Sequence, residues 1–174
     1  ASNALQTILN RKGNTDMIQA FSESKIGITN DLYLNAGIHF QYFLLNSHYS
    51  LEPRVALRWQ FARKHALSFG YGLHSQTEDV GVYLAEVHPD AETSLQPNRD
   101  LNFSRSHHVV LGYDYLIRND MRFKVETYYQ YLYDIPVIPG SYFSLINSEG
   151  WYSNDTLVNS GTGSNAGIDL TFEK

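Results

Sequence analysis

The sequence contains no cysteine, no long hydrophobic run and no excess of basic residues. Without cysteine, disulfide bonds and thiolate metal sites are excluded. No apolar stretch approaches the roughly 18 residues that indicate a membrane-spanning helix, although strands of a membrane barrel remain possible because only their alternate residues meet lipid. The net charge of −5 and the pI near 5.7 provide no basic surface for nucleic acid, so no nucleic-acid partner is expected.

Catalytic and metal-binding motifs are also missing. The sequence has no G-x-S-x-G, no P-loop, no dinucleotide fingerprint and no H-E-x-x-H pattern. His74, His88, His107 and His108 flank one long connection and could in principle gather a metal or haem. His107 and His108 are adjacent, however, so they point to opposite faces of a strand and cannot both face one site. We therefore expect no enzyme activity, no cofactor and no metal.

Alternation of apolar and polar residues predicts about seven β-strands. Successive side chains of a strand point to opposite sides, and most of these runs place their charges on one side only. Some runs reach 12 to 15 residues, whereas soluble strands mostly have about 5–6 and membrane strands about 9–11. The run at 18–28 alternates least well. The predicted strands are 18–28, 32–44, 55–61, 67–73, 107–117, 121–135 and 166–173.

Short and long connections alternate between these runs. Residues 30–31, 63–64 and 119–120 make nearly minimal turns, whereas 46–52, 77–104 and 136–165 are longer. Outer-membrane barrels have this asymmetry, with short periplasmic turns and long outer loops. The pattern therefore favours an all-β fold, an antiparallel up-and-down meander of about seven long strands that forms part of a larger transmembrane β-barrel. Seven strands do not make the even number of a bacterial barrel, so we expect further strands outside this sequence.

Several motifs, in order, resemble the barrel of TonB-dependent outer-membrane receptors from Gram-negative bacteria. Leu51-Glu52-Pro53-Arg54 is similar to the "EPR" strand start of that family. The further matches are Gly37-Ile38-His39-Phe40, Leu67-Ser68-Phe69-Gly70-Tyr71-Gly72, Leu95-Gln96-Pro97-Asn98, Gly112-Tyr113, the strand from Glu126 to Tyr133, Asn159-Ser160-Gly161 and Gly167-Ile168-Asp169. His39 stands where the family usually has Arg, and Asp169 where it has Glu.

This resemblance implies a piece of a barrel of about 22 strands, from its C-terminal half and without the plug that fills the lumen. Residues 1–4 are interpreted as a scar of tag cleavage, and residues 5–174 as the partial barrel. The family imports a scarce nutrient, such as a siderophore, vitamin, peptide or glycan, across the outer membrane. The implied partners are outer-membrane lipid, the nutrient, and the TonB complex acting through the absent plug.

Two sets of residues are candidates for function under this interpretation. Long outer loops should carry ligand contacts, and the charged strand faces should line the lumen. The candidate ligand-binding residues are Glu78, Asp79, Tyr83, Glu86, His88, Asp90, Tyr142, Phe143, Trp151 and Tyr152. The candidate lumen-facing residues are Arg54, Arg58, Asp114, Arg122, Lys124, Glu126 and Asp169.

Two alternatives stay open at the level of the sequence. The chain could be a self-contained soluble β-barrel or sandwich that binds a small apolar ligand, or it could belong to an adhesin or assembly porin. The direction of Trp59, Phe69, Leu111 and Phe123 separates the first alternative from a membrane barrel. Packed inward against each other, these side chains would favour the soluble module, and pointing outward they would favour the barrel.

Overall fold

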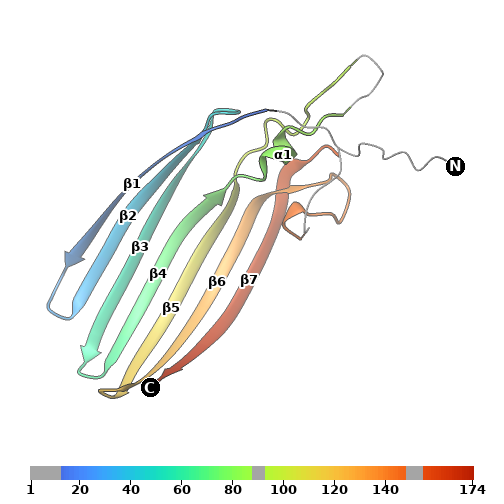
Figure 1. Cartoon of the computed structure of the whole chain (residues 1–174). Coiled ribbons are helices and arrows are strands. Elements are labelled where there is room, and N and C mark those ends of the chain that lie inside the picture. The colour runs from blue at the N-terminus through green and yellow to red at the C-terminus, as the bar shows by residue number, and fades with distance from the viewer. Residues whose placement is uncertain (1–12, 88–92, 148–154) are drawn as a thin grey trace.

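The computed structural model describes residues 13–87, 93–147 and 155–174, and shows one antiparallel sheet in which each strand pairs with the next along the chain (Figure 1). This confirms the predicted all-β meander. The strands are β1 (Met17–Gly27), β2 (Leu32–Phe43), β3 (His48–Ala62), β4 (His65–Gln76), β5 (Ser104–Arg118), β6 (Met121–Val137) and β7 (Val158–Glu173). The helices among the described residues are the short α1 (Val80–Tyr83) and the 3-10 turn η1 (Leu145–Asn147). No helix among the described residues is long and apolar enough to cross a membrane.

The register keeps apolar side chains together on one face of the sheet. Trp59 lies opposite Leu32, and Leu67 is opposite both Trp59 and Tyr113. Because paired residues share a face, each apolar row continues from strand to strand. The polar rows do the same on the other face, where Arg58 pairs with Ser68 and Asp114 with Lys124.

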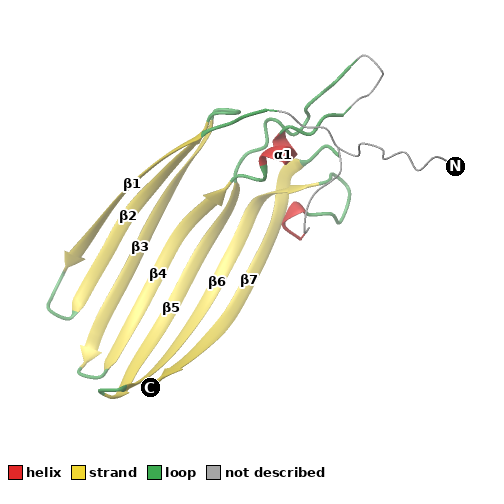
Figure 2. Cartoon of the chain, viewed as in Figure 1, coloured by secondary structure: helices red, strands yellow, loops and turns green. Residues whose placement is uncertain are grey.

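The two longest connections lie at one end of the strands, and three short turns lie at the other end (Figures 1 and 2). The four-residue connection 44–47 between β2 and β3 lies with the long connections, although the sequence predicted a longer loop over 46–52 there. At one end, residues 63–64 and 119–120 join strands as predicted, and residues 28–31 make the remaining turn. At the other end lie residues 77–103 and 138–157, which carry both short helices (Figure 2). We name these the turn end and the loop end.

A compact hydrophobic core sits at the loop end, outside the sheet proper. Tyr83 is fully buried and its ring packs against Phe43, with 5.0 Å between centroids. The long connections thus fold onto the ends of the strands and bury apolar surface there. The buried members of this core are Phe43, Val82, Tyr83, Ala85, Leu101, Phe103, Leu145 and Leu157.

Two strand starts differ from their predicted positions by seven or eight residues, more than any other boundary. β3 begins at His48, where the sequence predicted a loop over 46–52, and β7 begins at Val158 rather than near residue 166. The added residues of β7 pair with the end of β6, around a bulge at Leu132–Ile135. Residues 158–165 lack apolar alternation, so pairing with a distant strand, and not the local pattern, makes them a strand.

Candidate functional site

Charged side chains meet across strands on the polar face near the turn end. The buried carboxylate of Asp114 accepts hydrogen bonds from Arg58, at 2.8 Å, and from Arg122. Arg122 also reaches Glu173 at 3.5 Å. One strand supplies the carboxylate and its two guanidinium partners come from other strands, so this network holds β3, β5, β6 and β7 in register.

The other predicted lumen residues share this face. Lys124 pairs with Glu126 at 2.6 Å, and Glu126 lies opposite Asp169 in the ladder. Arg54 bonds to Glu52 at 3.0 Å. The register therefore brings all seven candidates, Arg54, Arg58, Asp114, Arg122, Lys124, Glu126 and Asp169, onto one face, as alternation predicted.

Glu52 bridges a seam between β3 and β4 near the loop end. Backbone pairing of these strands ends at Arg54 and Gly72, so the residues beyond have no ladder partners across this seam, although they still pair with β2 and β5. Glu52 Oε1 accepts the Ser75 backbone N–H at 3.1 Å, and Gln41 Nε2 donates to the Ser75 carbonyl at 3.0 Å. Glu52 is only 1% exposed and also bonds to His39 at 3.0 Å. Side chains thus replace the missing backbone bonds, which gives the glutamate of the "EPR" motif a structural role.

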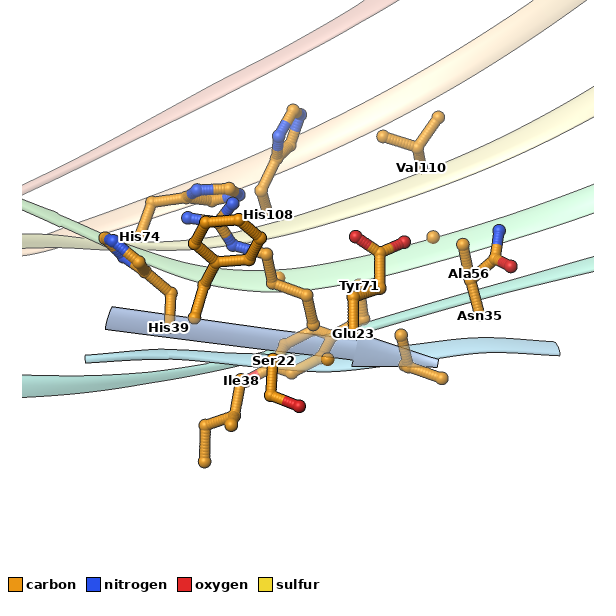
Figure 3. Close-up of a pocket in the computed structure, with 16 residues that line it drawn as sticks. Ser22, Glu23, Asn35, Ile38, His39, Ala56, Tyr71, His74, His108 and Val110 are labelled. Atoms are coloured by element: carbon orange, nitrogen blue, oxygen red, sulfur yellow. The ribbon is translucent and has the colours of Figure 1, made fainter. Parts of the chain in front are cut away.

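The polar face is hollowed. A hollow of about 530 Å³ is lined by residues of β1 to β5, among them Glu23, His39, His74 and His108 (Figure 3). Most of its lining belongs to the polar rows of the ladder, so the sheet curves around this face. The polar face is therefore the concave face.

The histidines that the structure describes do not gather around a metal position. His74 and His108 approach each other edge to face, with ring centroids 6.2 Å apart. His107 lies on the opposite face of the sheet, where its Nδ1 is 3.0 Å from the Tyr71 hydroxyl. Among the described residues, no group of three or more His, Asp or Glu side chains could hold a metal ion.

Residues of the 77–103 connection predicted to contact ligand mostly have structural partners. The Glu78 carboxylate accepts a hydrogen bond from Ser104, and its backbone N–H donates to the Tyr83 hydroxyl at 3.2 Å. Burial raises the pKa of Glu78 above its usual range and raises the pKa of Tyr83 to about 12. The Asp79 carboxylate caps α1 by accepting a hydrogen bond from the Gly81 backbone N–H at 2.7 Å. The Glu86 carboxylate accepts a hydrogen bond from the Gln96 side-chain amide at 3.4 Å.

The second long connection presents one conspicuous aromatic side chain. Tyr142 is fully exposed, whereas Phe143 is half-buried against the loop core. Four further candidates, His88, Asp90, Trp151 and Tyr152, and the proposed tag residues 1–4 lie outside the described residues.

Asparagines that were not among the predicted site residues hold the loop end together. The Asn98 side chain is fully buried, donating to the Asp155 carbonyl at 2.9 Å and accepting the Leu157 N–H at 2.8 Å. Asn46 donates to the Leu101 carbonyl at 2.8 Å, and Asn159 donates to the Asp134 carbonyl at 2.7 Å. Asn98 and Asn159 belong to motifs of the resemblance, but their partners lie 25 or more residues away and could not be read from spacing.

The apolar face is exposed and carries two aromatic belts. Leu111 is 56% exposed, and Trp59 and Phe69 are also open to the surroundings, so this face encloses no interior. The turn-end belt consists of Trp59, Phe61, His65, Tyr113, Tyr115, Phe123 and Phe172. The loop-end belt consists of Phe40, Tyr42, Tyr49, Tyr71, His107, Tyr129, Tyr131 and Tyr133.

Mostly aliphatic side chains fill the space between the belts. Val55, Leu57, Val109, Val125 and Ile168 belong to this apolar band. Phe123 of one belt and Tyr131 of the other lie on β6, about 27 Å apart along the strand at about 3.4 Å per residue. A strand tilt of about 40° would reduce this to about 21 Å, near the roughly 25 Å apolar height of outer-membrane barrels.

Solved structures share this arrangement of strands. The ferric enterobactin receptor PfeA of Pseudomonas aeruginosa matches with a TM-score of 0.63 at 15% identity, over 88% of this chain and 24% of that chain. The FrpB iron transporter of Neisseria meningitidis matches with a TM-score of 0.61 at 16% identity, over 88% of this chain and 22% of that chain. The ferric-catecholate import receptor Fiu of E. coli K12 matches with a TM-score of 0.65 at 11% identity, over 91% of this chain and 25% of that chain.

This chain has the fold of a TonB-dependent receptor barrel segment. The resemblance in the sequence motifs is thus confirmed at the level of the fold. The chain spans about a quarter of the length of these receptors. No family model and no curated protein matches the sequence. The structural neighbours are transport receptors rather than enzymes, in agreement with the absence of catalytic motifs from the sequence.

Proposed function

We propose that this chain forms part of the wall of an outer-membrane TonB-dependent transporter that imports a scarce nutrient in a Gram-negative bacterium. The observation that carries the proposal is the contrast between the two faces of one sheet. The convex face has an apolar band between two aromatic belts, and the concave face carries charged networks and a hollow. Lipid on one side and a water-filled or plug-filled lumen on the other account for both faces.

The aromatic belts support placement in a bilayer. Tyrosine at the boundary between lipid and water keeps its ring in hydrocarbon and its hydroxyl hydrated. In the loop-end belt the Tyr71 hydroxyl bonds to His107, and in the turn-end belt the Tyr113 hydroxyl bonds to His65 at 2.7 Å. These pairs give the polar atoms of both belts partners beside the apolar band.

The nutrient is proposed only as a class. The titles of the structural neighbours name ferric enterobactin and ferric catecholate as what those receptors bind or import. For this chain, siderophores, vitamins, peptides and glycans all remain candidates. Uptake would require the TonB complex and a plug domain, and the loop end would face the cell exterior, where exposed Tyr142 could contact the nutrient.

Site-directed spin labels on adjacent residues test this proposal directly. The chain has no cysteine, so an introduced cysteine is the single labelling site within it, once any cysteine elsewhere in the receptor has been replaced by serine. In the whole receptor in lipid vesicles, labels at Trp59 and Thr127 should be relaxed by oxygen, which concentrates in lipid. Labels at Arg58 and Glu126, one residue away on the opposite face, should be relaxed by a water-soluble nickel complex. The reverse pattern would contradict the proposal.

The soluble-module alternative has less support. It requires Trp59, Phe69 and Leu111 to pack together inside a closed barrel or sandwich, but all three are exposed on the outer side of a single open sheet. The enclosed core that the described residues form lies in the loops and contains none of these side chains.

A further inference from the structure

Two turns at the turn end bring three cationic side chains together. Arg63 and Lys64 form the turn between β3 and β4, and Arg118 is the last residue of β5. The Leu116 backbone N–H donates to the Lys64 carbonyl at 2.8 Å, and the Lys64 ammonium donates to the Ile117 carbonyl at 2.9 Å. These bonds place Lys64 beside the residue that precedes Arg118. All three cationic residues are exposed.

A bulge near the end of β5 turns Arg118 toward the convex face of the sheet. Leu116 pairs with Arg122 on the concave face, and after a register shift Arg118 pairs with Met121. Met121 lies two residues before Phe123 of the turn-end belt, so it shares the convex face, and so does its partner Arg118. Regular alternation would have put Arg118 on the concave face with Leu116. Bulges commonly redirect a side chain in this way.

The three cations have no carboxylate partner among the described residues. The ion pairs that these residues form involve other cations, such as Arg58 and Arg122 with Asp114. Asp31 and Asp120 also lie in turns at this end, but neither pairs with Arg63, Lys64 or Arg118. The cluster can therefore accept an anion from outside the chain.

The turn-end belt begins directly beside this cationic cluster. His65 follows Lys64 in sequence, and its ring stacks on Tyr115 with 4.7 Å between centroids. Phe61 stacks on the other ring contact of His65 and leads to Trp59, and both of these side chains are exposed. An amphipathic molecule could place its anionic group at the cluster and its hydrocarbon on these rings, because cations at the edge of an apolar band reach the headgroup level of a bilayer.

The long connections at the loop end have the opposite charge balance. Among their described residues Arg99 is the one cation, and carboxylates outnumber it. These carboxylates belong to Glu78, Asp79, Glu86, Asp100 and Asp155. An anionic partner of the convex face is therefore attracted to the turn end and repelled from the loop end.

We propose that Arg63, Lys64 and Arg118 bind the phosphate group of an anionic phospholipid whose acyl chains lie on Phe61 and Trp59. The phosphate oxygens accept charge-assisted hydrogen bonds from ammonium and guanidinium groups. A zwitterionic lipid binds less well, because its own cationic group offsets the phosphate. A phosphate ion in solution would use the same cations, but the exposed rings beside them favour a lipid. This inference rests on the proposed function, in which the convex face meets lipid and the turn end lies at the periplasmic side.

Quenching of bimane fluorescence by brominated lipids tests the site in the whole receptor. Leu67, an exposed convex residue two positions from His65, is replaced by cysteine and labelled with bimane, after any cysteine elsewhere has been replaced by serine. The vesicles contain equal parts of phosphatidylcholine and phosphatidylglycerol, and one or the other carries the bromine. We expect phosphatidylglycerol to be preferred beside Leu67 about fivefold or more, since one Lys or Arg near an anionic membrane contributes about that factor. Bimane at Leu51, exposed on the convex face at the loop end, should report no such preference.

Charge variants separate an anion site from a structural role of the same side chains. Lys64→Gln combined with Arg118→Gln should abolish most of the preference at Leu67. Lys64→Arg combined with Arg118→Lys keeps both charges and should keep the preference. Lys25→Gln combined with Arg99→Gln is the matched control, because it removes the same charges from the concave face and from a long connection, and should leave the preference unchanged.

The outcomes distinguish failure of the lipid site from failure of the transporter proposal. Equal quenching by the two lipids at Leu67, an equal preference at Leu51, a preference that survives the double glutamine variant at Lys64 and Arg118, or its loss in the charge-keeping variant would overturn the lipid site. In each of those cases brominated lipid would still quench bimane on the convex face, and the transporter proposal would stand. Absence of quenching by both lipids at both positions would contradict the two proposals together.

Discussion

Glu78 is a buried carboxylate at the loop end whose protonation is linked to folding of the loop. It lies between β4 and α1, where its carboxylate meets Ser104 and its backbone N–H meets Tyr83. Burial raises its pKa above the usual value of a glutamate, so the folded loop binds a proton that the unfolded loop releases. The stability linked to this proton is complete below about pH 4.5 and is lost as pH rises through the higher folded pKa.

We therefore expect protection of the α1 amides from hydrogen exchange, corrected for intrinsic rates, to decrease from pH 4.5 upward. Glu78→Gln retains an acceptor for Ser104 without the charge, so this variant should be more protected at neutral pH and lose the dependence. Asp79→Asn removes the same charge from the exposed neighbour that caps α1, and should keep the dependence because asparagine caps equally well. If protection of the α1 amides in the unsubstituted chain did not depend on pH, Glu78 would not be buried.

At the scale of the strand, β7 depends on contacts with β6 that require glycine. A Cβ added to Gly161 would lie 2.8 Å from the Ile135 carbonyl oxygen and 2.6 Å from Val137. The carbonyl belongs to the backbone at the β6 bulge and cannot rotate away. Two residues further on, a Cβ on Gly163 would meet nothing closer than 3.6 Å. Gly161 is thus a position of close strand approach, and Gly163 is not.

We expect Gly161→Ala to destabilise the pairing of β6 with β7 by about 1–3 kcal/mol, the usual cost of overpacking. Gly163→Ala should change stability by less than about 0.5 kcal/mol. Urea unfolding of the detergent-solubilised receptor, followed by tryptophan fluorescence, measures both variants. Equal stability of the two would mean that β6 and β7 do not approach as closely as described.

The strands also show which features a single sequence can predict. Alternation placed Arg58, Asp114 and Arg122 on one face, because the direction of a side chain depends only on its position in the strand. Which of them touch depends on register, and Arg58 meets Asp114 across 56 residues of chain. The local pattern does not contain that information.

The loop end was less predictable than the strands. Tyr83 was a candidate ligand contact because it stands in a polar connection, yet it is fully buried against Phe43. The core around it is assembled from two long connections and the end of β2, so no periodic pattern marks its members.

At the scale of the whole molecule, the exposed apolar band determines whether the chain can stay monomeric in water or needs lipid or detergent. Soluble monomers rarely expose contiguous apolar patches larger than a few hundred Å². Here Trp59, Phe69, Leu111, Ile168 and Leu170 are all exposed on one face, and the outer edges of β1 and β7 carry unpaired backbone groups. Unpaired strand edges promote association with other chains, so both features oppose a monomer in water.

We expect the 174-residue chain to aggregate in buffer and detergent to relieve the aggregation, as measured by size-exclusion chromatography with light scattering. Replacing outward Leu111, Ile168 and Leu170 together by lysine should lower the detergent requirement, because the band is then interrupted by charge. The matched change of inward Ser68, Gln130 and Asn165 to lysine should not, because these residues lie on the concave face. A compact monomer in buffer, with blue-shifted tryptophan emission, would mean that the apolar side chains pack inward, and the membrane placement would then be wrong.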